Sequence, residues 1–224
     1  MSQHSQTMTN VQLKSSTSTL YKVSKRIFDI AVSICIIILL SPLFIYVAIR
    51  IKKEDNGPVI FKQKRAGLNG EPFYIYKFRS MKIQTSSKKS SKNPYNWRGG
   101  VPDDFVFKNT NGFHPDVTKI GQFLRKYSVD EFPQFFNVLK GDMSIVGPRP
   151  EILEISDHYN DYQRQRLLVK PGITGWAQIN GRSEIPHGQK VEYDLYYVKH
   201  QNGILDIKIF IRTIYQAIFG KGAI

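Results

Sequence analysis

The sequence predicts a mostly helical α+β fold: a single membrane-docked domain with an N-terminal re-entrant helix broken at Ser41-Pro42, a β-hairpin and a C-terminal amphipathic helix. Three observations support this fold class. Residues 30–49 are twenty apolar or small residues without a formal charge, residues 58–81 alternate around an Asn-Gly pair, and residues 204–219 repeat apolar side chains at helical spacing.

Length and composition limit the possibilities further. The 224 residues suit one ordinary domain, which we place at residues 22–224 after a polar, disordered lead-in at residues 1–21. Lysine and arginine number 32 against 18 acidic residues, a formal charge of +14, which favours a polyanionic partner: nucleic acid, anionic lipid or a phosphorylated substrate. The single cysteine, Cys35, rules out a disulfide framework, and the five histidines lack metal-site spacing.

The apolar run is long enough for a membrane helix, since twenty residues rise about 30 Å. Pro42 removes the helix hydrogen bond to the Ile38 carbonyl, and the Ser41 hydroxyl can donate to that carbonyl instead. Basic residues flank the run on both sides, which favours both ends on the cytoplasmic side and a helix of about residues 27–50 that folds back at Ser41-Pro42. A kinked full span is the alternative; a wholly buried soluble helix fits this small domain poorly.

Residues 58–81 predict a hairpin turning at Asn69-Gly70. It ends in Lys77 and Arg79, which share a strand face and either hold a phosphate or form a solvated surface. Residues 84–112 follow, rich in Ser, Lys, Asn and Gly, and we expect a long loop there, either a lid or disordered.

The most informative stretch is residues 124–150, where Asp130 and Glu131 adjoin and Arg125 precedes them by five positions. In one interpretation Ser128 and Glu131 form a capping box. Pro133 opposes it, because proline is tolerated only in a first turn; a helix that starts later leaves both carboxylates beside its positive end. We expect this helix to run to residue 140 and to stop at a glycine.

Arg149 lies between two prolines, so its guanidinium sits on a stiff segment suited to gripping phosphate. Further on, Trp176 follows a glycine-rich turn and either stacks on a base or anchors the core. In residues 204–219, apolar side chains at 207, 210, 211, 214 and 218 oppose Lys208 and Arg212. Such a stripe is typical of an interfacial helix and equally of core packing.

An ordered set of motifs carries a family resemblance. They are Lys25-Arg26-x-Phe28-Asp29, the Ser-Pro break, PVIFKQKRAG, KFRSM, LRKYSVDEFPQ, GDMSIVGPRP and KPGITGWAQINGR. Together they resemble the bacterial sugar transferases, or monotopic phosphoglycosyl transferases, over residues 22–219.

The resemblance implies transfer of a sugar 1-phosphate from a UDP-sugar to undecaprenyl phosphate, with release of UMP, at the cytoplasmic face of the bacterial inner membrane, as the first step of surface glycan synthesis. It implies Asp130 as nucleophile, Glu131 as its partner, Arg125 and Arg149 as phosphate ligands, with Lys77 and Arg79 as further candidates. Magnesium is the implied cofactor, near Asp130. The partners are then the two substrates and membrane lipid, with no nucleic acid; the sugar and the oligomeric state are not encoded in any motif.

Elementary chemistry agrees with these roles. An aspartate of pKa near 3.9 is ionised at neutral pH and attacks phosphorus without a base, provided cations offset its repulsion from a diphosphate. A membrane-tethered binder of anionic lipid or nucleic acid is the rival interpretation, but it gains nothing from an acidic pair among arginines. A P-loop enzyme is excluded because GxxxxGK[ST] is missing.

Overall fold

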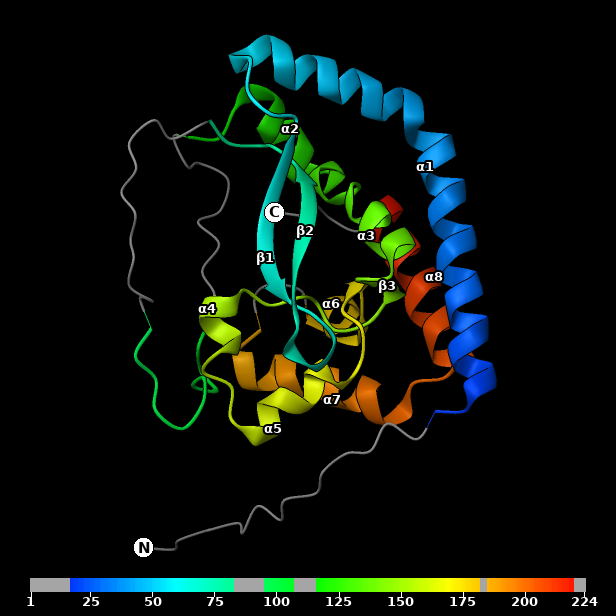
Figure 1. Ribbon diagram of the computed structural model, residues 1–224, viewed down its shortest axis with the longest axis vertical. Coiled ribbons are helices and arrows are strands. Elements are labelled where there is room, and N and C mark those ends of the chain that lie inside the picture. Colours follow the sequence, from blue (N-terminus) through cyan, green and yellow to red (C-terminus); the bar gives the residue numbers. More distant parts are fainter. Residues whose placement is uncertain (1–16, 83–94, 107–115, 182–184, 220–224) are drawn as a thin grey trace, which may run out of the picture.

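In the computed structural model, residues 17–82, 95–106, 116–181 and 185–219 are described, and they form a mostly helical α+β body flanked by one long bent helix (Figure 1). The fold class is therefore confirmed. The described elements are α1 (Thr19–Asp55), β1 (Ile60–Ala66), β2 (Pro72–Phe78), α2 (Lys119–Lys126), α3 (Gln134–Lys140), β3 (Ser144–Val146), α4 (Leu153–Ser156), α5 (Asp161–Arg164), β4 (Gly172–Thr174), α6 (Trp176–Gly181), α7 (His187–His200) and α8 (Gly203–Phe219), with short 3₁₀ turns η1 (Leu68–Gly70), η2 (Val129–Glu131) and η3 (Gln165–Leu168).

The helix α1 extends the expected membrane segment at both ends. It is long and apolar enough to cross a membrane, and among the described helices it alone meets that criterion. It remains helical through Pro42 and bends into two arms, so it does not fold back on itself as the expected hairpin (Figure 1). The predicted compensation is confirmed, because the Ser41 hydroxyl donates to the Ile38 carbonyl at 2.8 Å.

Both ends of α1 are bonded to the same body. Near its start, Lys25 pairs with Asp206 of α8 at 2.8 Å, and Asp29 accepts from the Ile145 amide of β3 at 2.9 Å. At its other end, the Glu54 carboxylate accepts from the Lys119 amide, the first residue of α2, at 2.7 Å. The bend therefore lies between two anchored arms.

The predicted hairpin is confirmed as the antiparallel pair β1–β2. Its connection is longer than a two-residue turn, although Asn69 and Gly70 both adopt the expected positive φ. Asn137 of α3 attaches the hairpin to the body: its amide oxygen accepts from the Tyr76 amide at 2.9 Å and its amide nitrogen donates to the Tyr74 carbonyl at 2.7 Å.

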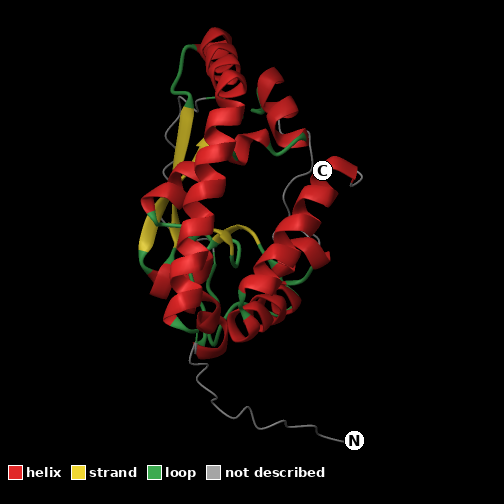
Figure 2. Cartoon of the chain, turned by 90° about the vertical axis from the view of Figure 1, so that its right-hand side faces the viewer, coloured by secondary structure: helices red, strands yellow, loops and turns green. Residues whose placement is uncertain are grey.

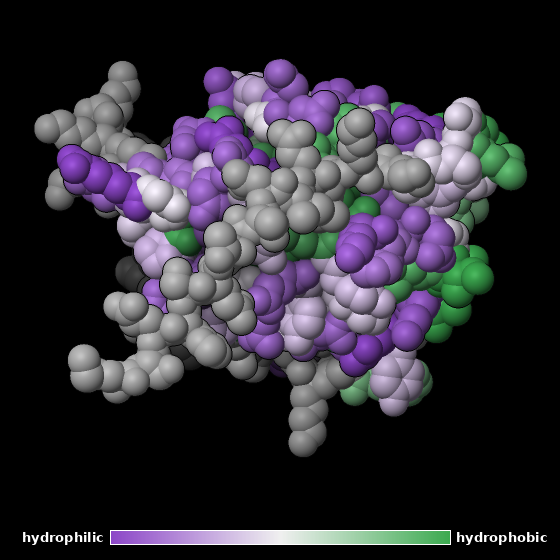
Figure 3. Space-filling view, turned by 90° about the horizontal axis from the view of Figure 1, so that it is seen from below, coloured by the Kyte–Doolittle hydropathy of each residue, from purple (hydrophilic) through white to green (hydrophobic). Residues whose placement is uncertain are grey.

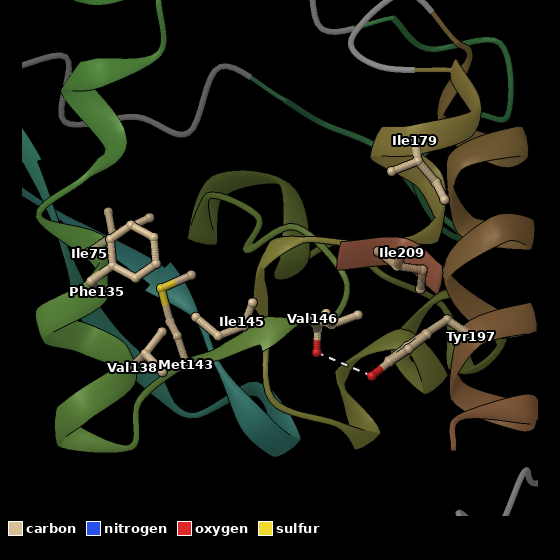
Figure 4. Packing of buried hydrophobic residues seen from close by; sticks show 9 residues of the cluster. All are labelled: Ile75, Phe135, Val138, Met143, Ile145, Val146, Ile179, Tyr197 and Ile209. Atoms are coloured by element: carbon tan, nitrogen blue, oxygen red, sulfur yellow. Dashed lines mark hydrogen bonds between the residues drawn. The ribbon is translucent and has the colours of Figure 1, made fainter. Parts of the chain in front are cut away.

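The main core lies between α3, the parallel pair β3–β4, α7 and α8 (Figure 4). Val138, Met143 and Ile209 are fully buried there, and the Tyr197 hydroxyl donates to the Val146 carbonyl at 3.2 Å. The predicted end of α3 is confirmed, because Gly141 terminates it at a φ of 93°.

Two segments differ from expectation or lie partly outside the description. Apolar side chains at 152, 155 and 159 predict one helix over residues 151–170. The structure breaks this segment into α4, α5 and η3, because Asn160 starts a new helix with a complete capping box. Of the expected loop at residues 84–112, only residues 95–106 are described; they carry no helix or strand, and Val101 is buried. Most of the expected lead-in, residues 1–16, is also outside the description.

The helix α8 exposes Ile207, Ile211 and Ile214 of its apolar stripe, whereas Phe210 packs against Phe28 of α1. Ile207 and Ile211 are 53% and 60% exposed, and on the opposite side of the helix Arg212 and Gln216 donate to the Asn180 side chain and the Ile179 carbonyl of α6. Core packing would bury that stripe, so the interfacial alternative is favoured. α1 and α8 lie on one side of the molecule (Figure 2), and apolar side chains gather along the same edge (Figure 3).

Candidate active site

The two acidic residues lie in a tight turn that the local sequence builds. Ser128 adopts a left-handed φ of 54°, η2 carries Asp130 and Glu131, and Pro133 stands just before α3. Ser128 makes no side-chain cap bond, so the capping-box alternative is wrong. Both carboxylates precede the helix, as a later start predicts.

Two of the predicted cations converge on Glu131. The Lys77 ammonium lies 2.7 Å from Glu131 Oε1, and Arg149 grips the same carboxylate through both nitrogens, Nη2–Oε1 at 2.6 Å and Nη1–Oε2 at 3.2 Å. Lys77 also lies 3.9 Å from Asp130 Oδ2. The hairpin, the η2 turn and the Pro148–Pro150 segment thus meet at one point.

The two carboxylates have opposite electrostatics. Burial alone would raise the pKa of Glu131, but the charges of Arg149 and Lys77 outweigh it and hold this pKa well below its ordinary value. Burial raises the pKa of Asp130; Lys77 opposes this rise and the negative Glu131 adds to it. Glu131 is therefore committed to the cations, whereas Asp130 is the more basic and less engaged carboxylate.

Of the other predicted cations, Arg125 acts electrostatically on this centre, and Arg79 is buried just after β2. Arg125, in the last turn of α2, donates from Nε to the Ser80 hydroxyl at 3.0 Å, and its charge also acts to lower the pKa of Asp130. Arg79 lies just beyond β2 and is 7% exposed, so the solvated-surface alternative is wrong for it.

Arg65 was missed by sequence reasoning. Its Nη1 donates to the Pro150 carbonyl at 3.3 Å, and burial followed by the nearby charge of Arg149 lowers its pKa. The alternation of side chains along the strands could have indicated this residue. Phe61 pairs with Lys77, and residues 61 and 65 lie on the same side of β1, so Arg65 and Lys77 share one face of the hairpin.

The donor set is compatible with magnesium but holds few ligands. Among the described parts of the chain, no group of three or more His, Cys, Asp or Glu side chains could hold a metal ion. Mg²⁺ commonly binds one or two carboxylates together with substrate phosphates. Asp130 suits that role, because its contact with Lys77 is long, at 3.9 Å, and does not commit its oxygens to a close cation.

Trp176 is an anchoring residue in this structure. Its ring stacks on Tyr196 with centroids 5.3 Å apart, and the Lys208 ammonium lies 5.5 Å from the ring centre. These neighbours occupy the indole, so the anchoring alternative is favoured over base stacking.

Comparison with known proteins agrees with the geometry. Residues 20–220 match the family described as bacterial sugar transferase. The uncharacterized sugar transferase EpsL of Bacillus subtilis is 38% identical over 89% of this chain and 90% of its own length. The UDP-glucose:undecaprenyl-phosphate glucose-1-phosphate transferase of Escherichia coli is 40% identical over 90% of this chain, and the undecaprenyl-phosphate galactose phosphotransferase of Salmonella typhimurium is 41% identical over 89%.

The coverage of the relatives differs. This chain spans 42% of the Escherichia coli relative and 41% of the Salmonella relative, so it corresponds to part of those proteins. The family match itself extends over nine-tenths of the chain, including α1, both carboxylates and α8. The chain therefore belongs to the bacterial sugar transferase family.

Proposed function

We propose that this protein is a phosphoglycosyl transferase that moves a sugar 1-phosphate from a UDP-sugar to undecaprenyl phosphate, forming undecaprenyl-diphosphate-sugar and UMP. The observation that carries the proposal is that Asp130, whose carboxylate lies 3.9 Å from Lys77, adjoins a second carboxylate that holds Lys77 and Arg149 at 2.7 and 2.6 Å. The activities for which the Escherichia coli and Salmonella relatives are named support the lipid acceptor and the class of donor.

In the first step, an oxygen of ionised Asp130 attacks the phosphorus that bears the sugar. A new bond from the carboxylate oxygen to phosphorus forms, the bond to the bridging oxygen breaks, and UMP leaves with that oxygen. The product is a mixed anhydride between Asp130 and the sugar phosphate. Lys77, Arg149 and Arg125 offset the charge that accumulates on the phosphoryl oxygens.

In the second step, a phosphate oxygen of undecaprenyl phosphate attacks the same phosphorus and Asp130 leaves as a carboxylate. Glu131 acts by holding Lys77 and Arg149 toward the reacting phosphate. A proton relay through Glu131 is disfavoured, because the pKa of this carboxyl lies well below its ordinary value and its anion is a weak base.

Magnesium fits this site as a partner of the substrate. Asp130, and Glu131 if it releases a cation, would hold it together with the donor diphosphate. When bound, it would neutralise phosphate charge. Lys77 and Arg149 remain responsible for orienting the diphosphate in this scheme.

The anchoring of α1 supports a proposed membrane placement. Both ends of α1 bond to the body that carries the site, which supports a bent helix that enters and leaves the cytoplasmic face of the bacterial inner membrane. The exposed apolar stripe of α8 would lie in the same interface. In this arrangement Asp130 would lie near the depth of the lipid phosphate.

The test is UMP release by purified protein in detergent with Mg²⁺, over a panel of UDP-sugars, with and without undecaprenyl phosphate. We expect lipid-dependent release with at least one donor, and Asp130→Asn should abolish both transfer and any covalent sugar-phosphate adduct. Arg98→Gln serves as a control for loss of a surface charge, since Arg98 is exposed on residues 95–106. An adduct that persists in Asp130→Asn would refute the nucleophile, and strongly salt-dependent lipid binding without UMP release would favour a tether instead.

A further inference from the structure

A buried ion pair lies behind the segment that carries Arg149. Arg166 of η3 is 1% exposed and Asp194 of α7 is 0% exposed. Arg166 Nη2 lies 2.5 Å from Asp194 Oδ2, and Arg166 Nη1 donates to the Tyr159 hydroxyl and to Glu151 Oε2, the latter at 3.4 Å. None of these groups takes part in the proposed chemistry.

Burying such a pair costs desolvation free energy that an apolar pair of similar volume would not cost. Arg166 makes a contact toward the active site that an apolar side chain could not make: its Nη2 also donates to the backbone carbonyl of Arg149 at 3.1 Å. Asp194 supplies the counter-charge that lets this guanidinium stay charged in the interior.

The Pro-Arg-Pro segment has a particular need for such a bond. Pro148 and Pro150 have no amide hydrogen, so their part of the backbone is held through carbonyl oxygens. Four consecutive carbonyls are held in this way, that of residue 148 by the Gly172 amide at 2.8 Å, 149 by Arg166, 150 by Arg65, and 151 by the Ala66 amide at 2.9 Å. Arg166 thus supports the residue whose side chain grips Glu131.

We propose that Arg166 is a positioning residue for Arg149, with Asp194 of α7 as its counter-ion. Through this pair, α7 fixes the orientation of the Arg149 guanidinium that binds phosphate. This inference rests on the proposed function for its turnover readout. A displacement of about 1 Å at a substrate-positioning group is enough to cost on the order of a hundredfold in rate.

The experiment is a double-mutant cycle between Arg166→Gln and Arg149→Lys, read out as kcat/KM for UMP release and as the Kd for UDP measured by calorimetry. In the wild-type background, Arg166→Gln should lower kcat/KM roughly 10- to 100-fold and weaken UDP binding. In the Arg149→Lys background the further loss should be less than about threefold, because Arg166 acts through Arg149.

Two controls separate positioning from stability. Ile155→Ala opens a cavity in the core cluster that contains Tyr159, and should lower the Tm while leaving kcat/KM per folded molecule within about threefold. Arg164→Gln removes an exposed arginine that donates to the Tyr159 carbonyl instead, and should leave both readouts unchanged. If Arg166→Gln does not fold, Arg166→Lys keeps the charge without the planar fork and takes its place.

Equal losses in both backgrounds, or a loss that Ile155→Ala reproduces, would overturn the positioning role. Failure of the proposed function has a different signature, because UDP would bind the wild type without UMP release from any donor, and the affinity cycle would still decide the role of Arg166. A wild type that binds no UDP would overturn both.

Discussion

Neutralising Glu131 should destabilise the protein, whereas neutralising the adjacent Asp130 should not. Glu131 accepts three charge-assisted bonds, at 2.6, 2.7 and 3.2 Å, and its pKa is held well below the ordinary value. Glu131→Gln keeps one acceptor oxygen but removes the charge that Lys77 and Arg149 face. The Arg149 side chain is 47% exposed and can be rehydrated, which reduces the loss.

The expected magnitude follows from these contacts. A hydrogen bond to a charged group contributes about 1.5–3 kcal/mol, and after allowance for rehydration and the remaining oxygen we expect Glu131→Gln to cost about 2 kcal/mol. For a chain of this size that lowers the Tm by about 4–8 °C. Asp130→Asn removes a charge whose pKa burial has raised, so we expect an unchanged or raised Tm, by up to about 4 °C.

The assay is thermal unfolding of the three proteins in one detergent at pH 7, at one scan rate because unfolding of a membrane protein is seldom reversible. The sign also depends on pH. The contribution of Glu131, whose pKa is lowered, is present at neutral pH and lost as pH falls through its folded-state pKa, so wild type and Glu131→Gln should converge in acid. Equal Tm values at pH 7, or a larger loss for Asp130→Asn, would refute this electrostatic account.

Three further predictions concern the site and the membrane. The acid limb of the pH profile of kcat/KM should lie above pH 3.9, the ordinary aspartate value, because burial raises the pKa of Asp130. In Glu131→Gln the limb should move to lower pH, because the negative charge of Glu131 adds to that rise. A pH profile of UMP release tests this, and an unmoved limb contradicts it. Pro42→Ala should restore the helix hydrogen bond to the Ile38 carbonyl and straighten α1, so that the helix crosses the membrane. A cysteine added before Thr19 should then be labelled from the periplasmic side of spheroplasts. Unchanged labelling would argue against the bend as the cause of the topology. Ile207→Lys with Ile211→Lys should loosen attachment to vesicles without lowering the Tm, since both side chains are exposed and α1 still holds the bilayer. Loss of Tm with unchanged attachment would mean that the stripe packs in a core.

The elements predicted best are those that depend on local chemistry. The hairpin was readable because Asn69 and Gly70 tolerate a positive φ between alternating strands, and the end of α3 because Gly141 does the same. The Ser41 bond to the Ile38 carbonyl was predictable for a similar reason, since proline leaves that oxygen without its helical donor.

Other features depend on contacts between distant residues, which no local pattern contains. The pairing of Glu131 with Lys77 spans 54 positions, and nothing in a Ser-x-x-Glu motif says that its acid is taken by a strand residue. Local pattern was also insufficient for residues 151–170. Apolar spacing suggested one helix there, but the Asn160 capping box starts a new helix, and Arg166 further along is buried. Arg166 is a charged residue in a polar stretch, and only the folded chain shows that its partner lies in α7.

The stripe on α8 shows how a correct pattern can leave two environments open. Spacing alone did not distinguish core packing from membrane contact, because a core and a bilayer both accept apolar side chains. The decisive evidence lies on the opposite face, where Arg212 and Gln216 bond to α6 and leave Ile207 and Ile211 outward. A helix in a water-soluble protein would invert this arrangement, since outward isoleucines cost about 25 cal/mol for each Å² of exposed apolar surface. Together with Asp206, which is buried against Lys25 of α1, these contacts make α8 part of the fold, so deletion of residues 204–224 would test folding as much as membrane attachment, and only surface substitutions on the stripe isolate the membrane contribution.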